Sequence, residues 1–339
     1  MDATLLWLQL AGTAGIILFA ATFMAGSADV IAIRTGLGRT FIGVVMLATA
    51  TSLPELGTGV SSIVWLGEPD LAAGDAFGSN IFNLLIIGLL DFFWRDGPLL
   101  NRVSLTAALI GALGILTMGL AAASIFLHGE LDFAIANYIS PMTLVILAAF
   151  AVSMWIIYRA ERGDGASEDR GASEGEAQPS SSLQRAFVVY GISAAAVVVA
   201  AIWLANTGDS LADELGLERS FIGTQFLALS TSLPELAASI AAIRLGAPEL
   251  AISNVLGSNL FNMGFILFAD DIVYTDGPLW EIVAPVHIFT AVIAMLMTAV
   301  VIIALLSQER GRPGRFFTFE AVMLAALYLG GSVLIFQLA

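Results

Sequence analysis

Two short polar motifs stand inside apolar stretches of this sequence, and their residue types are those that bind hard cations. Both read TSLPE, over 51–55 and over 231–235. Each proline lacks a backbone N–H and interrupts its helix, which frees carbonyl oxygens near Ala50 and Ser230. Carboxylate, hydroxyl and carbonyl oxygens are the ligands that hard cations prefer. The candidate side-chain ligands are Glu55, Glu235, Thr51, Thr231, Ser52 and Ser232.

A second repeated motif follows each TSLPE by one helix. Residues 74–83 read GDAFGSNIFN and residues 253–262 read SNVLGSNLFN. A serine and an asparagine four residues apart share one helix face in each copy, namely Ser79 with Asn83 and Ser258 with Asn262. Asp75 lies one turn earlier on that face and is an additional candidate. The motif also suits helix packing, because Gly78 and Gly257 allow close backbone approach, and the two roles are compatible.

The elements that carry these motifs are membrane spans. The chain is 58% hydrophobic and 12% charged, with a mean hydropathy of +0.90. Apolar stretches of about twenty residues, enough to cross a hydrocarbon core, recur along its length. We predict an all-α membrane protein with ten transmembrane helices at 6–32, 40–65, 70–93, 103–126, 135–158, 186–205, 219–245, 249–270, 281–306 and 316–338.

The two halves of the sequence are copies of one another. Thirteen of twenty positions are identical between 36–55 and 216–235. Because the copies are five spans apart, the second enters the membrane from the opposite side, and we predict two inverted five-helix repeats, 1–158 and 186–339. Inverted repeats are typical of secondary transporters, whose sites lie near the bilayer midplane. The segment between them, 159–185, is rich in Gly, Ser and acidic residues and is expected to be a flexible loop.

Charge placement predicts the orientation and excludes one class of partner. With the N-terminus outside, twelve of the thirteen arginines fall in inner loops, which is a strong positive-inside bias. The expected location is therefore the cell membrane, with both termini outside and the loop 159–185 in the cytoplasm. The net charge of -15 argues against nucleic acid as a partner, and the absence of cysteine excludes thiolate metal sites.

Glu55 and Glu235 stand near the middle of their predicted spans. A carboxylate at that depth costs about 2.5–3.5 kcal/mol on insertion scales. No lysine or arginine stands at the centre of any predicted span to compensate. A bound cation or a proton must therefore balance these charges.

With its two TSLPE motifs, each followed by a Gly-Ser-Asn motif, the sequence resembles the cation/calcium exchanger superfamily, which includes the sodium/calcium exchangers. The resemblance covers all ten predicted spans and implies a central site that binds calcium and sodium competitively. At matching positions it implies ligands at Glu55, Glu235, Thr51, Thr231, Ser52, Ser232, Ser79, Asn83, Ser258 and Asn262, with the carbonyls of Ala48 and Ala228 lining sodium sites.

Two positions depart from the superfamily pattern. Several members carry an aspartate where Asn262 stands, so the site here has less negative charge. The usual glycine before Thr-Ser is Ala50 in one copy and Ser230 in the other. The first departure bears on whether protons or potassium take part in transport.

The sequence therefore predicts a secondary antiporter rather than an enzyme, with bound Ca²⁺ and Na⁺ as substrates and no cofactor. Two glutamates neutralise one divalent ion or two monovalent ions, so either load is able to cross. A Ca²⁺/H⁺ exchanger on the same fold is the first alternative, and the lack of a carboxylate at Asn262 favours sodium. An intramembrane hydrolase that uses Ser79 or Ser258 with His287 is an alternative of another class.

Overall fold

The computed structural model describes residues 3–94, 97–130, 139–168, 181–214, 227–307 and 318–338. These residues form helices joined by short connections, and no strand occurs among them. The helices are α1 (Ala3–Thr35), α2 (Arg39–Ile42), η1 (Gly43–Leu47), α3 (Ala48–Thr51), α4 (Leu53–Ser61), η2 (Ser62–Leu66), α5 (Pro69–Phe93), η3 (Leu99–Arg102), α6 (Leu105–Glu130), α7 (Pro141–Glu168), α8 (Leu183–Glu214), α10 (Leu233–Arg244), α11 (Pro248–Phe261), η4 (Asn262–Ile266), α12 (Leu267–Val273), α13 (Leu279–Ile282), α14 (Val286–Ser307) and α15 (Phe319–Leu338).

The predicted all-α membrane fold is confirmed. Within the described ranges, 9 helical segments are long and apolar enough to cross a membrane. The remaining predicted span, 219–245, is described from 227 onward, where a helical segment 227–231 leads into α10. The count of ten helices in two inverted repeats remains a prediction.

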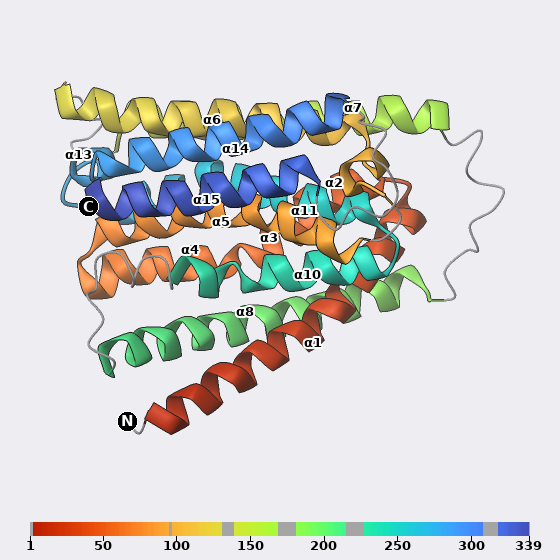
Figure 1. Cartoon of the computed structure of the whole chain (residues 1–339), viewed down its shortest axis with the longest axis horizontal. Coiled ribbons are helices and arrows are strands. Elements are labelled where there is room, and N and C mark those ends of the chain that lie inside the picture. Colours follow the sequence, from red (N-terminus) through yellow and green to blue (C-terminus); the bar gives the residue numbers. More distant parts are fainter. Residues whose placement is uncertain are drawn as a thin grey trace.

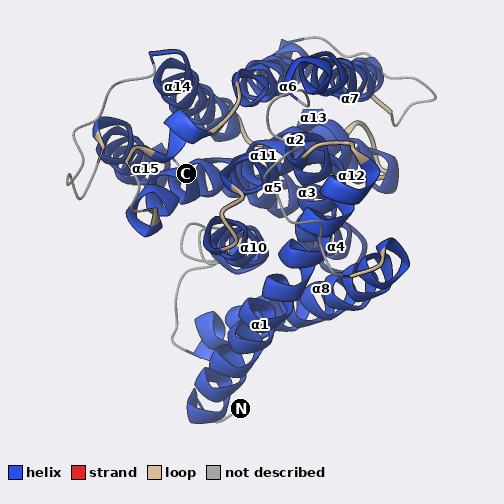
Figure 2. Ribbon diagram, turned by 90° about the vertical axis from the view of Figure 1, so that its right-hand side faces the viewer, coloured by secondary structure: helices blue, strands red, loops and turns tan. Residues whose placement is uncertain are grey.

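The two helices that carry the Gly-Ser-Asn motifs lie at the centre of the bundle. In the continuous span of α11, η4 and α12, 94% of the most apolar stretch is buried inside the protein. In the spans of α7 and α15, the buried share of that stretch is 22%. Figure 2 shows α5 and α11 surrounded by the other helices, with α1 and α8 together on one side and α6 and α7 on another. Both ends of the chain lie at the same end of the bundle, on the left in Figure 1. We call this the terminal end.

The Gly-Ser-Asn glycines allow the two halves to meet, as predicted. A Cβ on Gly257 would lie 2.8 Å from the Cα of Val44, in η1. A Cβ on Gly78 would lie 3.2 Å from the Cβ of Ala228, beside the second TSLPE motif. Each glycine therefore brings a central helix against the interrupted helix of the other repeat.

The predicted boundary at the start of the polar segment is wrong. We expected a loop over 159–185, but α7 continues well into it. Its turns at the membrane edge are held by cation–π contacts four residues apart: Arg159 lies 4.8 Å from the ring of Trp155, and Arg162 lies 4.7 Å from the ring of Tyr158. Such contacts stabilise a helix that leaves the apolar region, so polarity alone does not end it.

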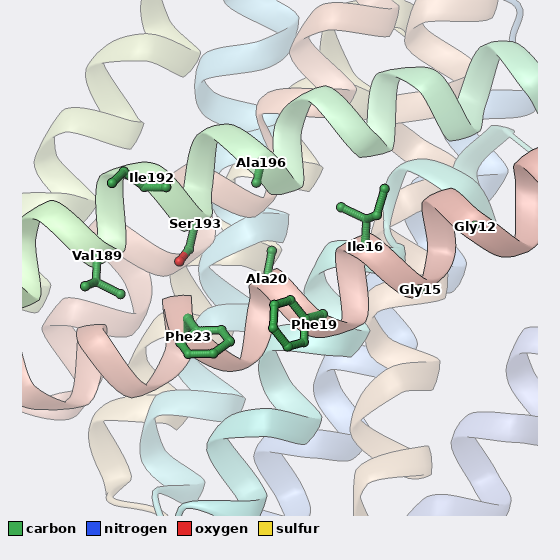
Figure 3. A pocket seen from close by; sticks show the side chains of 10 residues that line it. All are labelled: Gly12, Gly15, Ile16, Phe19, Ala20, Phe23, Val189, Ile192, Ser193 and Ala196. Carbon is green, nitrogen blue, oxygen red and sulfur yellow. The ribbon is translucent and has the colours of Figure 1, made fainter.

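A groove of about 570 Å³ lies between α1 and α8, away from the central helices (Figure 3). Its lining is apolar or glycine except for one hydroxyl, that of Ser193. Phe19 and Phe23 of α1 contribute the largest side chains. The groove offers no carboxylate, so the candidate cation ligands must be sought in the core.

Candidate cation site

Both TSLPE motifs interrupt a helix at their serine. Ser52 has φ -91° and ψ 4°, and Ser232 has φ -85° and ψ 3°, outside the helical region. A new helix begins at the next residue, and the proline occupies its first turn, where a missing N–H costs nothing. Glu55 and Glu235 therefore stand in the first turns of α4 and α10. The helix dipole and free N–H groups at these positions stabilise a negative charge.

The two motifs hold each other's glutamates across the repeat interface. Ser52 donates a hydrogen bond from its hydroxyl to Oε1 of Glu235 at 2.9 Å. Ser232 donates in the same way to Oε1 of Glu55 at 3.1 Å. The hydroxyl of Ser258 adds a second bond to Oε1 of Glu235 at 3.2 Å. The structure thus brings together serines and glutamates that are about half the chain apart.

An asparagine network occupies the amide nitrogens of two predicted ligands. Asn83 donates from Nδ2 to Oδ1 of Asn259 at 3.0 Å, and Asn262 donates from Nδ2 to Oδ1 of Asn80 at 3.2 Å. Asn259 in turn donates to the backbone carbonyl of Asn80 at 3.2 Å. Because the amide nitrogens of Asn83 and Asn262 are occupied in this way, their carbonyl oxygens point elsewhere.

Within the two repeated motifs of the described chain, four buried carboxylate and amide oxygens have no hydrogen-bond partner. They are Oε2 of Glu55, Oε2 of Glu235, Oδ1 of Asn83 and Oδ1 of Asn262. All four residues are at most 1% exposed. Buried polar atoms are nearly always paired, so orphaned oxygens at these positions indicate a place for a cation.

The remaining predicted side-chain ligands lie around this set, but their hydroxyls are already engaged. Thr51 donates to the carbonyl of Leu47 at 3.0 Å and lies 3.5 Å from the hydroxyl of Ser258. Thr231 lies 3.5 Å from the hydroxyl of Ser79 and occupies the equivalent place in the other half. A hydroxyl that donates still has lone pairs to offer a cation. Ligation by these residues remains a prediction.

The carbonyls of Ala48 and Ala228 are not released by the helix interruptions. The Ala48 carbonyl accepts the N–H of Ser52 at 3.0 Å, and the Ala228 carbonyl accepts the N–H of Ser232 at 3.0 Å. The hydroxyls of Thr51 and Thr231 approach the same two carbonyls at 3.3 and 3.2 Å. Helical bonding persists up to the serine because each proline removes only the bond to the carbonyl four residues before it, that of Ala50 or Ser230. A role for these carbonyls in ion binding remains a prediction.

Asp75 also lies in the core, but both of its oxygens have partners. Thr58 donates to Oδ2 at 2.6 Å and Thr231 donates to Oδ1 at 3.1 Å. Its repeat counterpart, Asn254, instead donates to the hydroxyl of Ser239 at 3.0 Å. The two halves therefore share the central glutamates but differ at this position.

No cationic side chain of the described residues pairs with the two glutamates. Arg39 instead lies 2.6 Å from Asp29, and Nε2 of His287 lies 3.3 Å from Asp70. The hydrolase alternative required His287 to pair with Ser79 or Ser258. His287 instead stacks on Phe77, with ring centroids 5.7 Å apart. Ser79 contacts Thr231, and Ser258 donates to Glu235. The buried negative charge is thus left for a mobile ion to balance.

Sequence reasoning missed three residues that support the site. Asn80 and Asn259 are inside the repeated Gly-Ser-Asn motif, so the repeat itself marks them, yet only the structure shows that they fix the amides of Asn83 and Asn262. Tyr190 of α8 carries no sequence signal. Its hydroxyl donates to the carbonyl of Met46 at 2.5 Å, within the π-helical turn η1 that precedes the first TSLPE motif.

We expect Tyr190→Phe to lower stability with little effect on the shape of the apolar core. The lost hydrogen bond is worth about 0.5–1.5 kcal/mol, and thermal unfolding of the purified protein should shift down by a few degrees. Tyr158→Phe is the matched control, because its ring packs on Phe41 at 5.3 Å and the change keeps that contact. Equal unfolding temperatures for the two variants would contradict this role for Tyr190.

Solved structures share this fold over nearly the whole chain. The structure of the sodium-calcium exchanger NCX_Mj soaked with 10 mM Na+ and zero Ca2+ matches with a TM-score of 0.72 and 19% identity, covering 98% of this chain and 99% of that one. A second structure of NCX_Mj, soaked with 2.5 mM Na+ and 10 mM Sr2+, matches with a TM-score of 0.71 and 21% identity over 98% and 99% of the two chains. This chain therefore has the fold of the NCX_Mj structures.

Sequence comparisons agree with the fold. The chain is 26% identical over 313 residues to "Inner membrane protein YrbG" of Escherichia coli (strain K12), covering 88% of each chain. It is 27% identical over 343 residues to "Putative antiporter CaxA" of Alkalimonas amylolytica, covering 97% of each. It is 30% identical over 147 residues to "Sodium/calcium exchanger MaX1" of Methanosarcina acetivorans, covering 43% of this chain and 39% of that one.

Fold and relatives together define a multi-pass membrane protein that transports cations by antiport and is not an enzyme. The family described as "Sodium/calcium exchanger protein" matches residues 5–160 and 185–337. The chain therefore belongs to the sodium/calcium exchanger family. The two matched stretches leave out a short interval inside the polar segment 159–185.

Proposed function

We propose that this chain exchanges Na⁺ for Ca²⁺ by alternating access around the site between Glu55 and Glu235. The observation that supports it most is the crossed arrangement of the two motifs, in which each serine aligns the other repeat's glutamate and leaves Oε2 of both glutamates without a partner. Two carboxylates are neutralised by one Ca²⁺ or by two Na⁺. Either load crosses an apolar barrier far more readily than the empty, doubly charged site.

The same geometry supports sodium rather than protons as the coupling ion. At Asn262 the chain has an amide whose Nδ2 is bonded to Asn80 and whose Oδ1 is left as a neutral acceptor. A neutral oxygen serves as a ligand for Na⁺ or Ca²⁺ but does not carry a proton across. The charge that changes during transport is then restricted to the two glutamates.

For the moving part we propose α1 and α8, which pack on each other beside the central helices (Figure 2). We further propose that the two halves, 1–158 and 186–339, are the inverted repeats, with both termini outside and the 159–185 segment in the cytoplasm. Arginine placement supports this orientation, and both ends of the chain lie at the terminal end of the bundle.

The coupling ion is tested by flux into proteoliposomes of the purified protein. Vesicles loaded with Na⁺ and diluted into Na⁺-free medium at equal pH should take up radiolabelled Ca²⁺, and an imposed pH gradient without Na⁺ should not drive uptake. The membrane potential is clamped in both cases. Uptake that follows the pH gradient and ignores Na⁺ would instead assign the protein as a Ca²⁺/H⁺ exchanger.

A further inference from the structure

One buried carboxylate has no part in the site described above. Asp270, on α12, is 0% exposed, and neither of its carboxylate oxygens has a hydrogen-bond partner among the described residues. Its neighbour Asp271 is equally buried but fully engaged: it accepts from the backbone N–H of Leu279 at 2.7 Å and from the hydroxyl of Thr143 at 2.6 Å. Asp271 therefore has a structural role that Asp270 lacks.

The Asp270 carboxylate faces the same helix as the central site. A Cβ on Gly59 would lie 2.8 Å from Oδ1 and 3.0 Å from Oδ2 of Asp270, so the absence of a side chain makes room for the carboxylate. Gly59 is four residues after Glu55 on α4, one helical turn along the same face. Asp270 thus lies about one turn, roughly 5–6 Å along the helix, from the level of Glu55 toward the end of α4.

A second buried carboxylate reaches the same part of α4 from another helix. Asp75 on α5 accepts the hydroxyl of Thr58, the residue next to Gly59 on α4, and α5 also packs against α12, which carries Asp270. Asp75 is 1% exposed, and its hydrogen bonds from Thr58 and Thr231 connect this region to the central site. Two buried carboxylates with no cationic partner among the described residues leave a charge of two to be balanced.

This region lies toward the terminal end of the bundle. The end of α4 connects to the start of α5 through η2 and a tight turn at Gly67. The first turn of α5 meets the start of α14, where Asp70 accepts the N–H of Ala284 at 2.7 Å. Figure 1 shows the region around α13, which precedes α14, at the same end as the two termini.

The repeat symmetry is broken at every residue of this region. Asp271 corresponds to Asp91, because each accepts the backbone N–H of the leucine eight residues later, and Asp270 therefore corresponds to Leu90. Asp75, Thr58 and Gly59 correspond to Asn254, Ala238 and Ser239. The pair of Asp270 and Asp75 therefore occurs in one repeat only.

We propose that Asp270 and Asp75 form a second cation position, through which Ca²⁺ passes between the central site and the terminal end of the bundle. The orphaned oxygens of Asp270 supply its free ligands, and Gly59 keeps the space beside them open. One divalent ion balances the two carboxylates. Because Asp75 also bonds Thr231, occupation of this position is coupled to the central site. The inference rests on the proposed exchange of Ca²⁺ and adds to it a binding step between the central site and the terminal end.

The first test is equilibrium binding of radiolabelled Ca²⁺ to the full chain in lipid nanodiscs. The Glu55→Gln/Glu235→Gln variant should lose the central site but keep weak, saturable binding of one Ca²⁺ per chain. Adding Asp270→Asn should abolish that residual binding. Equal binding by the double and triple variants, including none in either, would overturn the proposal and leave Asp270 as a protonated, packed side chain.

The second test is the sidedness of transport in vesicles of known orientation. Asp270→Asn and Gly59→Ala should each raise the half-saturating Ca²⁺ concentration at the terminal end by about tenfold or more, with less than about a twofold change at the other end. Gly57→Ala is the control, because its Cβ would meet only Ile202 at an ordinary 3.4 Å and the other repeat has alanine there. Asp270→Leu replaces the carboxylate with the residue that the other repeat has at this position. The same one-sided change in this variant would assign the effect to loss of the carboxylate and not to loss of the fold.

The two proposals fail in distinguishable ways. Exchange that depends on Na⁺ and on Glu55 but is unchanged, or changed equally from both sides, in Asp270→Asn overturns the second position alone. An absence of Na⁺-driven Ca²⁺ uptake by the wild-type chain overturns the proposed exchange, while residual Ca²⁺ binding that requires Asp270 would still be measurable.

Discussion

Glutamine at Glu55 or at Glu235 is expected to reduce Na⁺-driven Ca²⁺ uptake to the level of protein-free liposomes. Both side chains are fully buried, and each offers one carboxylate oxygen without a partner. With a single carboxylate, a bound Ca²⁺ would leave an uncompensated charge in a low-dielectric site, at a cost of several kcal/mol, so we expect a loss of about 100-fold or more. The measurement is initial uptake by reconstituted protein at equal protein density.

The matched control for this prediction is Glu68→Gln. Glu68 is an exposed glutamate at the start of α5, and the same isosteric change there removes a charge without touching the core. Uptake by this variant should stay within about twofold of the wild type. If Glu55→Gln or Glu235→Gln retained full sodium-driven exchange, the two glutamates would not be the ligands, whatever the fold.

Alanine at Gly257 is expected to cause a large loss of stability. Its Cβ would lie 2.8 Å from the backbone Cα of Val44 and 3.0 Å from the Cβ of Ala48. Backbone cannot rotate away as a side-chain tip does, so α11 and η1 must separate, at a cost of about 1–3 kcal/mol or more. Thermal unfolding should begin several degrees lower, and Ca²⁺ should protect the variant less because Ser258, which donates to Glu235, moves with α11.

Gly330→Ala on α15 provides the comparison. A Cβ at Gly330 meets no atom within 4 Å, and alanine favours a helix more than glycine does. This variant should unfold at or slightly above the wild-type temperature. Similar behaviour of the two alanine variants would show that the contact between α11 and η1 does not limit stability.

Much of the architecture can be predicted from the order of residues in the sequence. Apolar length predicts spans, and self-similarity between 36–55 and 216–235 predicts which residues recur. Both are properties of the sequence itself, so the sequence predicts Glu55, Glu235 and the Ser/Asn positions as candidate ligands. The prediction was less accurate where local contacts decide, as at α7, whose cation–π pairs carry the helix beyond the apolar stretch.

The sequence alone determined that two glutamates stand in a duplicated, hydroxyl-rich motif inside apolar stretches, because repetition and apolar length are properties of the order of residues. Only the tertiary structure decided that Ser52 aligns Glu235 rather than Glu55, since hydrogen bonds depend on distances between segments far apart in the chain. Packing likewise decided that Asp271 is satisfied and Asp270 is not. Two adjacent aspartates have the same chemistry in the sequence, and only the donors that neighbouring elements bring to Asp271 distinguish it from Asp270.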